Sequence, residues 1–324
     1  MPHKLNDAHR DKFPKAKYRV TNWSEYDRGL VQRGDVRFWV EQEVIDGWAA
    51  PIRQTPGGQR RFSNLAIEAT LLLGAVYRLP LRQTEGFVRS LLDLMDAGVP
   101  APDHTTLSRR RRTVAVDMRV SAHTKPTDIV LDSTGLKFYG AGEWARQKHG
   151  ETRRSWRKLH ISVDPATSEI VAHELTDDDT SDTAMAGPLV AGSGGNIRRV
   201  FADGAYDGAP VTAAIRVARP PRSPPKIIVP PRKQSIPPPG QAHGGTEREC
   251  HAAEIAAHGR MAWQKNNDYG LRSLVETGVS RIKRFNGGKL TARTFSAQRG
   301  EIAMQIAALN RMIRAMKPTT IRVA

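Results

Sequence analysis

The stretch IVLDSTGLKF, residues 129–138, gives the first indication of the fold. Its run of β-branched and apolar residues is typical of a strand in the centre of a sheet. Residues 156–164 and 169–175 alternate between polar and apolar side chains on either side of the turn Pro165-Ala166-Thr167. Because side chains alternate with period two along a strand, these residues predict a hairpin beside the first strand.

The elements that follow alternate between helix and strand. We expect helices at residues 180–190 and 210–218, strands at 198–203 and 226–229, and closing helices at 265–285 and 296–316. This order predicts an α/β domain with a mixed sheet over residues 125–317, and it is similar to the order of the ribonuclease-H-like fold. Residues 219–262 begin with a proline-rich stretch, so we expect an insertion there that is irregular over 219–245.

The preceding residues predict a separate all-α region. Residues 1–20 are charged and contain proline, and we expect them to form a disordered basic tail. Helices are expected at residues 36–48, 63–77 and 85–97.

A further helix, beginning at Asp103 or Thr105, runs into a row of arginines: Arg109, Arg110, Arg111 and Arg112. Two helices, a Gly/Pro turn and a basic third helix predict a helix-turn-helix-like region at residues 21–118 that binds DNA. We expect its arginines to contact phosphates rather than to read bases. A helical bundle with a solvated basic face would show the same pattern.

The charge balance indicates the class of partner. Lys and Arg number 50 against 33 Asp and Glu, which gives a formal net charge of +17. That excess favours a polyanion, first of all nucleic acid, with a membrane surface as the alternative. The longest apolar run, residues 65–81, is interrupted by Glu68, Arg78 and Pro80, so we expect no membrane span. The absence of an apolar leader and the single Cys250 fit a reducing cytoplasm.

Two aspartates fall where a sheet can bring them together. Asp132 lies inside the first strand and Asp203 ends the fourth, so adjacent strands would carry both carboxylates to one rim, where a helix could add Glu276. Burying a carboxylate in so apolar a run is costly unless it is paired or bound to metal. Three such groups repel one another, and two Mg²⁺ ions would remove that repulsion. The plainer alternatives are turn-forming roles for the two aspartates.

The stretch KNNDYGLRSLVETGVSRIKRF, residues 265–285, supplies that helix. On one continuous α-helix, Arg272, Glu276 and Lys283 would lie within about 60° of Tyr269. An acid, two cations and a phenol in one stripe suit a metal-bound phosphate. A solvated face with an Arg272–Glu276 ion pair is the alternative.

These stretches resemble bacterial DDE transposases, most closely the insertion-sequence-five family. The resemblance lies in VLDSTG around Asp132, VFADGAYD around Asp203 and the pattern Y-x2-R-x3-E-x6-K from Tyr269 to Lys283. It extends to RRSWRKLHISVD, RVTNWSEYDRGLVQRGD and VPAPDHTTLSRRR, and so covers nearly the whole chain.

The resemblance implies an enzyme that cleaves the ends of an insertion sequence and joins the 3′-hydroxyl ends to target DNA. It implies two Mg²⁺ ions, for which Mn²⁺ can substitute, held by Asp132, Asp203 and Glu276. Lys283 and Arg272 would contact phosphates, and Tyr269 would steady the DNA backbone. The implied setting is the bacterial cytoplasm, at the nucleoid.

The expected partners are double-stranded DNA, as terminal inverted repeats and as target, and a second copy of the chain, because two ends must be brought together. A basic hairpin rim adds further expected DNA contacts at Arg153, Arg154, Arg157 and Lys158. Two alternatives remain: a non-catalytic DNA-binding protein derived from a transposase, and a related nuclease that cuts but does not join.

Overall fold

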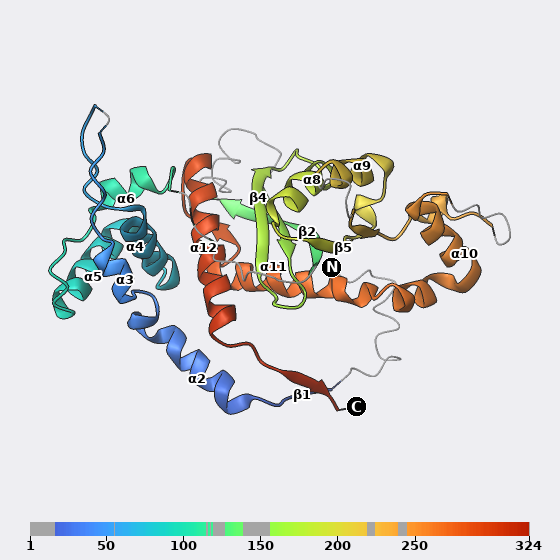
Figure 1. Ribbon diagram of the computed structural model, residues 1–324, viewed down its shortest axis with the longest axis horizontal. Coiled ribbons are helices and arrows are strands. Elements are labelled where there is room, and N and C mark those ends of the chain that lie inside the picture. Colours follow the sequence, from blue (N-terminus) through green and yellow to red (C-terminus); the bar gives the residue numbers. More distant parts are fainter. Residues whose placement is uncertain are drawn as a thin grey trace, which may run out of the picture.

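The computed structural model describes residues 17–54, 56–114, 116, 118, 127–138, 156–218, 224–238 and 245–323. Residues 1–16 of the expected tail and the candidate DNA contacts Arg153 and Arg154 lie outside these ranges. Figure 1 shows the described chain with a helical region at one end, a sheet in the middle and α10 (Glu247–Asn266) at the other end.

The sheet has the expected mixed, ribonuclease-H-like order. Its strands are β2 (Thr127–Phe138), β3 (Arg157–Val163), β4 (Ile170–Asp177), β5 (Ile197–Phe201) and β6 (Lys226–Ile228). They lie in the order β4-β3-β2-β5-β6. β2, β3 and β4 form an antiparallel meander, whereas β5 and β6 run parallel to β2. A short strand, β7 (Lys289–Leu290), pairs with the far end of β2.

Both faces of this sheet are covered because β2 carries apolar side chains on both sides. Ile129 and Leu131 pack with α8 (Asp182–Gly192) and α9 (Ala209–Ala218). Val130 and Leu136 point the opposite way, toward α11 (Ser273–Asn286) and α12 (Phe295–Ala315). The near-continuous apolar run at the start of β2 is thus explained by burial on two faces.

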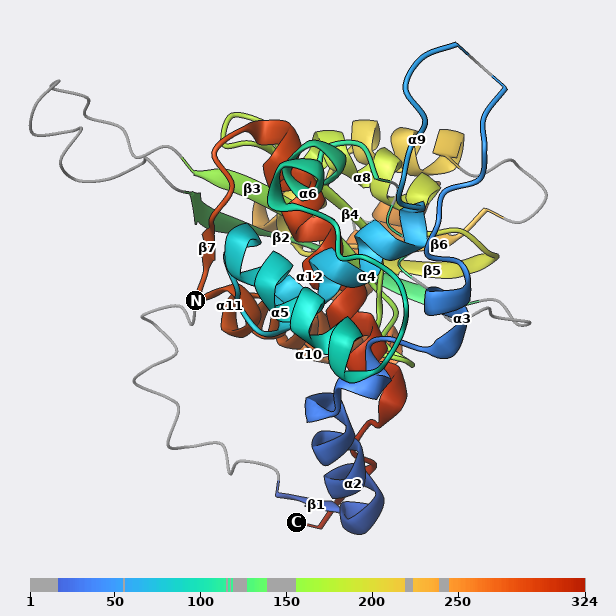
Figure 2. The same ribbon diagram turned by 90° about the vertical axis from the view of Figure 1, so that its left-hand side faces the viewer.

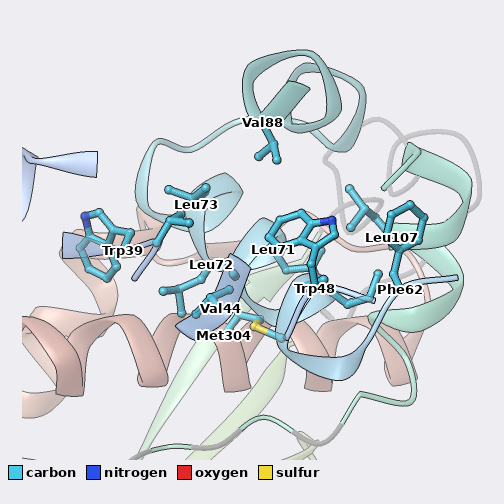
Figure 3. Packing of buried hydrophobic residues seen from close by; sticks show 14 of the residues in the cluster. Trp39, Val44, Trp48, Phe62, Leu71, Leu72, Leu73, Val88, Leu107 and Met304 are labelled. Atoms are coloured by element: carbon cyan, nitrogen blue, oxygen red, sulfur yellow. The ribbon is translucent and has the colours of Figure 1, made fainter. Parts of the chain in front are cut away.

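The helical region consists of α2 (Trp23–Gly34), a 3₁₀ turn η2 (Val36–Phe38), α3 (Gln42–Asp46), α4 (Asn64–Val76), α5 (Leu81–Leu94) and α6 (His104–Arg110). α4 begins where the Ser63 hydroxyl accepts from Ala66 N, and α6 where the Asp103 carboxylate accepts from the backbone N–H of Thr105 and Thr106. Such caps satisfy N–H groups that lack a partner within the helix. Trp48, Phe62, Leu72 and Leu107 are among the side chains that fill its core (Figure 3).

The prediction of one helix over residues 36–48 was wrong. η2 and α3 are separated by extended backbone at Glu41. Trp39, Val40, Val44, Ile45 and Trp48 are all buried, yet on a single helix they would spread over about 240° of its surface. Breaking the helix allows all five to reach the core.

α12 belongs to both cores. Met304, Ala307 and Ala308 pack with the helical region, whereas Ile302 and Ile306 pack with the sheet. Viewed from the helical end, α4 lies across α12 (Figure 2). The helical region and the α/β domain therefore share α12.

A further expectation, at the N-terminus, needed correction. Residues 18–20 of the expected disordered tail form β1 (Tyr18–Val20), which pairs with β8 (Thr320–Arg322). The expected insertion at 219–262 contains α10 (Glu247–Asn266), begun by a capping box of Thr246 and Glu249 and kinked at Gly259. The prolines precede this helix and do not prevent it.

Candidate active site

The sheet places two carboxylates side by side on one rim. β2 and β5 are parallel with Val130 opposite Phe201, so Asp132 and Asp203, each two residues further on, lie on neighbouring paths. Asp203 follows the end of β5 and caps the 3₁₀ turn η3 (Gly204–Tyr206), accepting from Ala205 N at 2.8 Å. Asp132 accepts from Ser133 N at 2.8 Å.

The guanidinium of Arg272 joins these two carboxylates to a third. Its Nη2 is 3.8 Å from Asp132 Oδ2 and 3.7 Å from Asp203 Oδ2. Its Nη1 donates to Glu276 Oε1, in the first turn of α11, at 2.7 Å. Residues 132, 203 and 276, distant in sequence, thus surround one cation.

The electrostatics of this rim disfavour the ionised form of Asp132. Burial raises the pKa of Asp132, and the carboxylates of Asp203 and Glu276 add to that effect. The backbone N–H of Ser133 and the charge of Arg272 oppose it without cancelling it. Additional positive charge at this position would be favourable.

The continuous helix predicted for residues 265–285 was wrong. Asp268 adopts a left-handed conformation (φ 53°), residues Tyr269–Arg272 form a 3₁₀ turn (η5), and α11 begins at Ser273. The break turns Tyr269 inward, where its ring packs 5.1 Å from that of Trp263. Arg199 holds Asp268 at 2.8 Å and so fixes the turn against β5.

Tyr269 is consequently tied to the acid rim. Its hydroxyl donates to the carbonyl of Ala202, the residue before Asp203, at 3.1 Å. Burial raises the pKa of Tyr269 to about 12, so the phenol remains protonated at neutral pH. Glu276 and Lys283 lie two turns apart on α11, and both are exposed.

Sequence reasoning missed a polar cluster behind Asp132. Asp182, at the start of α8, lies 3.0 Å from Lys158 Nζ and 3.4 Å from His160 Nδ1. Burial opposes its ionisation, but the polar side chains of His160, Ser133 and Lys158 hold the pKa of Asp182 well below its usual range. His160 is fully buried and also bonds Thr176 Oγ1 at 2.9 Å.

Tyr206 completes this cluster. Its ring is 2% exposed, and its hydroxyl has no hydrogen-bond partner among the described residues. Burial raises the pKa of Tyr206, and the charges of Asp182, Asp132 and Asp203 raise it further. The sequence signal that could have identified Tyr206 is its position three residues after Asp203, within VFADGAYD.

The predicted DNA contacts fall into two groups. Lys283, Arg109 and Arg112 are exposed. The other described cations are engaged within the protein: Arg110 with the Phe62 carbonyl and Asn64, Arg111 with Glu301, Arg157 with Asp177 and Gln298, and Lys158 with Asp182. Arg109 donates to Thr106 Oγ1 at 3.2 Å, within its own helix, and Arg272 is engaged by the acids of the rim. The exposed group can therefore meet a phosphate without leaving a partner on another element.

The family of the chain follows from its match to two family models. Both are described as a transposase DDE domain; one matches residues 31–141 and the other residues 123–311, more than half of the chain. The chain belongs to the transposase DDE domain family. The second match spans all three carboxylates described above.

This transposase DDE domain protein is also similar to one solved structure, the cryo-EM synaptic complex of piggyBac transposase with hairpin DNA. The match covers 92% of this chain and 77% of that chain, with 12% sequence identity and a TM-score of 0.38. Among the described residues, no helix has the length and apolar character needed to cross a membrane.

Membership of this family implies a divalent metal, and the donor set of the rim suits one. Three carboxylates are ligands that a hard cation such as Mg²⁺ prefers. Burial and the neighbouring carboxylates raise the pKa of Asp132, and a bound cation would favour its ionised form. The described residues nevertheless contain no group of three or more acidic, His or Cys side chains arranged to hold an ion. The three acids instead surround the Arg272 guanidinium.

Proposed function

We propose that this protein is an insertion-sequence transposase of the insertion-sequence-five type, which cleaves the element's ends and joins the 3′-hydroxyl ends to target DNA. The observation that supports this most strongly is the convergence of Asp132, Asp203 and Glu276 on one rim of a ribonuclease-H-like sheet. The setting would be the bacterial cytoplasm, at the nucleoid.

In this proposal Asp132, Asp203 and Glu276 would hold two Mg²⁺ ions, for which Mn²⁺ could substitute. Metal ions at such a site stabilise negative charge on the attacking and leaving oxygens of a phosphoryl displacement. The protein supplies the rigid frame: β2 and β5 fix two of the acids, and the Tyr269–Ala202 hydrogen bond fixes the segment that carries the third.

The exposed cations would hold the DNA backbone. Lys283 lies two turns beyond Glu276 on the same face of α11, where it can contact a phosphate next to the scissile one. Arg109 and Arg112, at the end of α6, would add contacts from the helix-turn-helix-like region. Tyr269 would act through its bond to Ala202, by holding the rim, rather than by meeting DNA directly.

The chemistry is tested by single substitutions at the acids. Asp132→Asn, Asp203→Asn and Glu276→Gln should each abolish cleavage of a duplex carrying the element's end, while binding of that duplex stays close to wild type. Cleavage that persists in any purified variant would remove that residue from the site. Wild-type protein that binds the duplex but never cuts it would favour the non-catalytic alternative.

Joining needs its own measurement. A pre-cut end with a free 3′-hydroxyl is incubated with supercoiled plasmid, and covalent joining is scored on a gel. A protein that cuts ends but never joins them is a nuclease only. Lys283→Ala should slow both reactions and lower the slope of log K against log salt for DNA binding by about one unit.

A further inference from the structure

Arg272 lies where the positive charge of a metal site belongs. Its guanidinium contacts all three carboxylates of the rim, at 2.7, 3.7 and 3.8 Å. Its side chain is 24% exposed, so the group is inserted among the acids and does not extend into solvent. It therefore neutralises carboxylates that would otherwise repel one another.

The guanidinium is poorly satisfied in that position. Of the contacts to the acids, only the one to Glu276 has the length of a hydrogen bond, since the two to the aspartates exceed 3.5 Å. The Nε atom is buried and has no hydrogen-bond partner among the described residues. Arginine has five N–H donors in a planar fork, which a phosphate matches with two parallel hydrogen bonds. A phosphate therefore satisfies more of the N–H donors of Arg272 than the single hydrogen bond to Glu276 does.

The backbone allows the side chain to exchange partners. Arg272 is the last residue of η5 and directly precedes α11. The turn is fixed on its other side by Tyr269 and Asp268, which bond the end of β5 and Arg199. The Cα of Arg272 is therefore held, while its long side chain can rotate from the acids toward the exposed face of α11 that carries Lys283.

We propose that Arg272 is a built-in counter-ion that occupies the acid rim in the absence of DNA and leaves it for a DNA phosphate. A divalent cation and the guanidinium compete for the same carboxylate oxygens, so each weakens the binding of the other. A phosphate that captures the guanidinium frees the acids, and binding of DNA and of the cation then favour one another. This inference rests on the proposed function, because it assumes that the rim takes a metal.

The test measures Mn²⁺ binding directly, by electron paramagnetic resonance of the free ion, with no cleavage readout. DNA-free wild type should bind Mn²⁺ weakly, and Arg272→Ala and Arg272→Met should bind it at least tenfold more tightly. Arg272→Lys keeps a cation and should stay near wild type. Arg284→Ala is the matched control, since it removes an exposed arginine from α11 and leaves the rim untouched.

The second arm adds a 20-base-pair duplex of unrelated sequence at low salt, with the duplex alone as blank. The duplex should tighten Mn²⁺ binding at least tenfold in wild type and much less in Arg272→Met. Equal or weaker Mn²⁺ binding by Arg272→Ala and Arg272→Met without DNA overturns the inference, because the arginine would then be organising the acids. Mn²⁺ binding by no variant, with or without DNA, overturns the proposed function together with it.

Discussion

Replacing Gly300 by alanine tests how the helical region is held against α12. A methyl group built on Gly300 would lie 2.1 Å from the backbone carbonyl oxygen of Arg111, just after α6. Non-bonded heavy atoms prefer about 3.5 Å, so the two segments would have to separate by about 1.4 Å for full relief of the overlap. That movement would also pull Arg111 from its bonds to the Ala297 carbonyl (3.2 Å) and Glu301 (2.7 Å).

The expected magnitude combines opposing effects. Glycine to alanine within a helix is worth about 1 kcal/mol in favour of folding when there is room. Overpacking costs about 1–3 kcal/mol, and weakening the ion pair between Arg111 and the nearly buried Glu301 costs up to about 3 kcal/mol more. We therefore expect Gly300→Ala to destabilise the protein by about 2 kcal/mol.

The assay is thermal and urea unfolding of the full chain, followed by circular dichroism. Gly86, inside α5, is the matched control because a methyl group placed on its Cα would meet no atom within 4 Å, and Gly86→Ala should stabilise by about 0.5–1 kcal/mol. A Gly300→Ala protein as stable as Gly86→Ala would refute the close packing of Arg111 on α12.

Three other perturbations have defined outcomes. Burial, aided by Arg299, lowers the pKa of His173 to about 4. Between pH 6.5 and 4 the unfolded chain therefore binds a proton that the folded chain does not, and the melting temperature should fall as the pH is lowered through that window. The fall should be less steep in His173→Gln, and parallel melting-temperature curves for the variant and the wild type would contradict this. Tyr206→Phe should melt at or above the wild-type temperature, because its buried hydroxyl has no partner among the described residues; a clear drop would reveal one. Asp103→Ala should cost about 1 kcal/mol at pH 7 through the lost cap of α6. Bonds from the Thr105 hydroxyl and the Thr106 N–H lower the pKa of Asp103, so this cost should shrink in melts taken as the pH falls below about 4, and a constant cost would argue against the cap.

Local sequence patterns predicted the first three strands of the sheet, because hydrophobic runs and alternation depend only on residues that are neighbours in the sequence. The apolar run at 129–138 and the alternation at 156–164 and 169–175 correspond to β2, β3 and β4. The order of helices and strands then restricted the topology to a mixed sheet. The placement of Asp132 beside Asp203 followed from adjacency of the first and fourth strands, which the structure confirms.

Features set by distant contacts could not be read in the same way. The break before α11 exists because Tyr269 meets Trp263 and the Ala202 carbonyl, which no helical period reveals. The arginine run looks uniformly exposed in sequence, yet Arg111 is engaged by Glu301, 190 residues away. The position of Arg272 among three acids likewise depends on tertiary structure.

The double burial of α12 also constrains the order of events during synthesis. The hydrophobic core of the helical region includes Met304, Ala307 and Ala308 of α12, which the ribosome translates long after α6. Until then that core is incomplete. At about 5–20 residues per second, the roughly 200 intervening residues take on the order of 10–40 s. During that interval the nascent helices expose an apolar surface that their own segment cannot cover, so they are a natural substrate for chaperones. A nonsense codon ahead of residue 295 would leave both halves of the polypeptide incomplete.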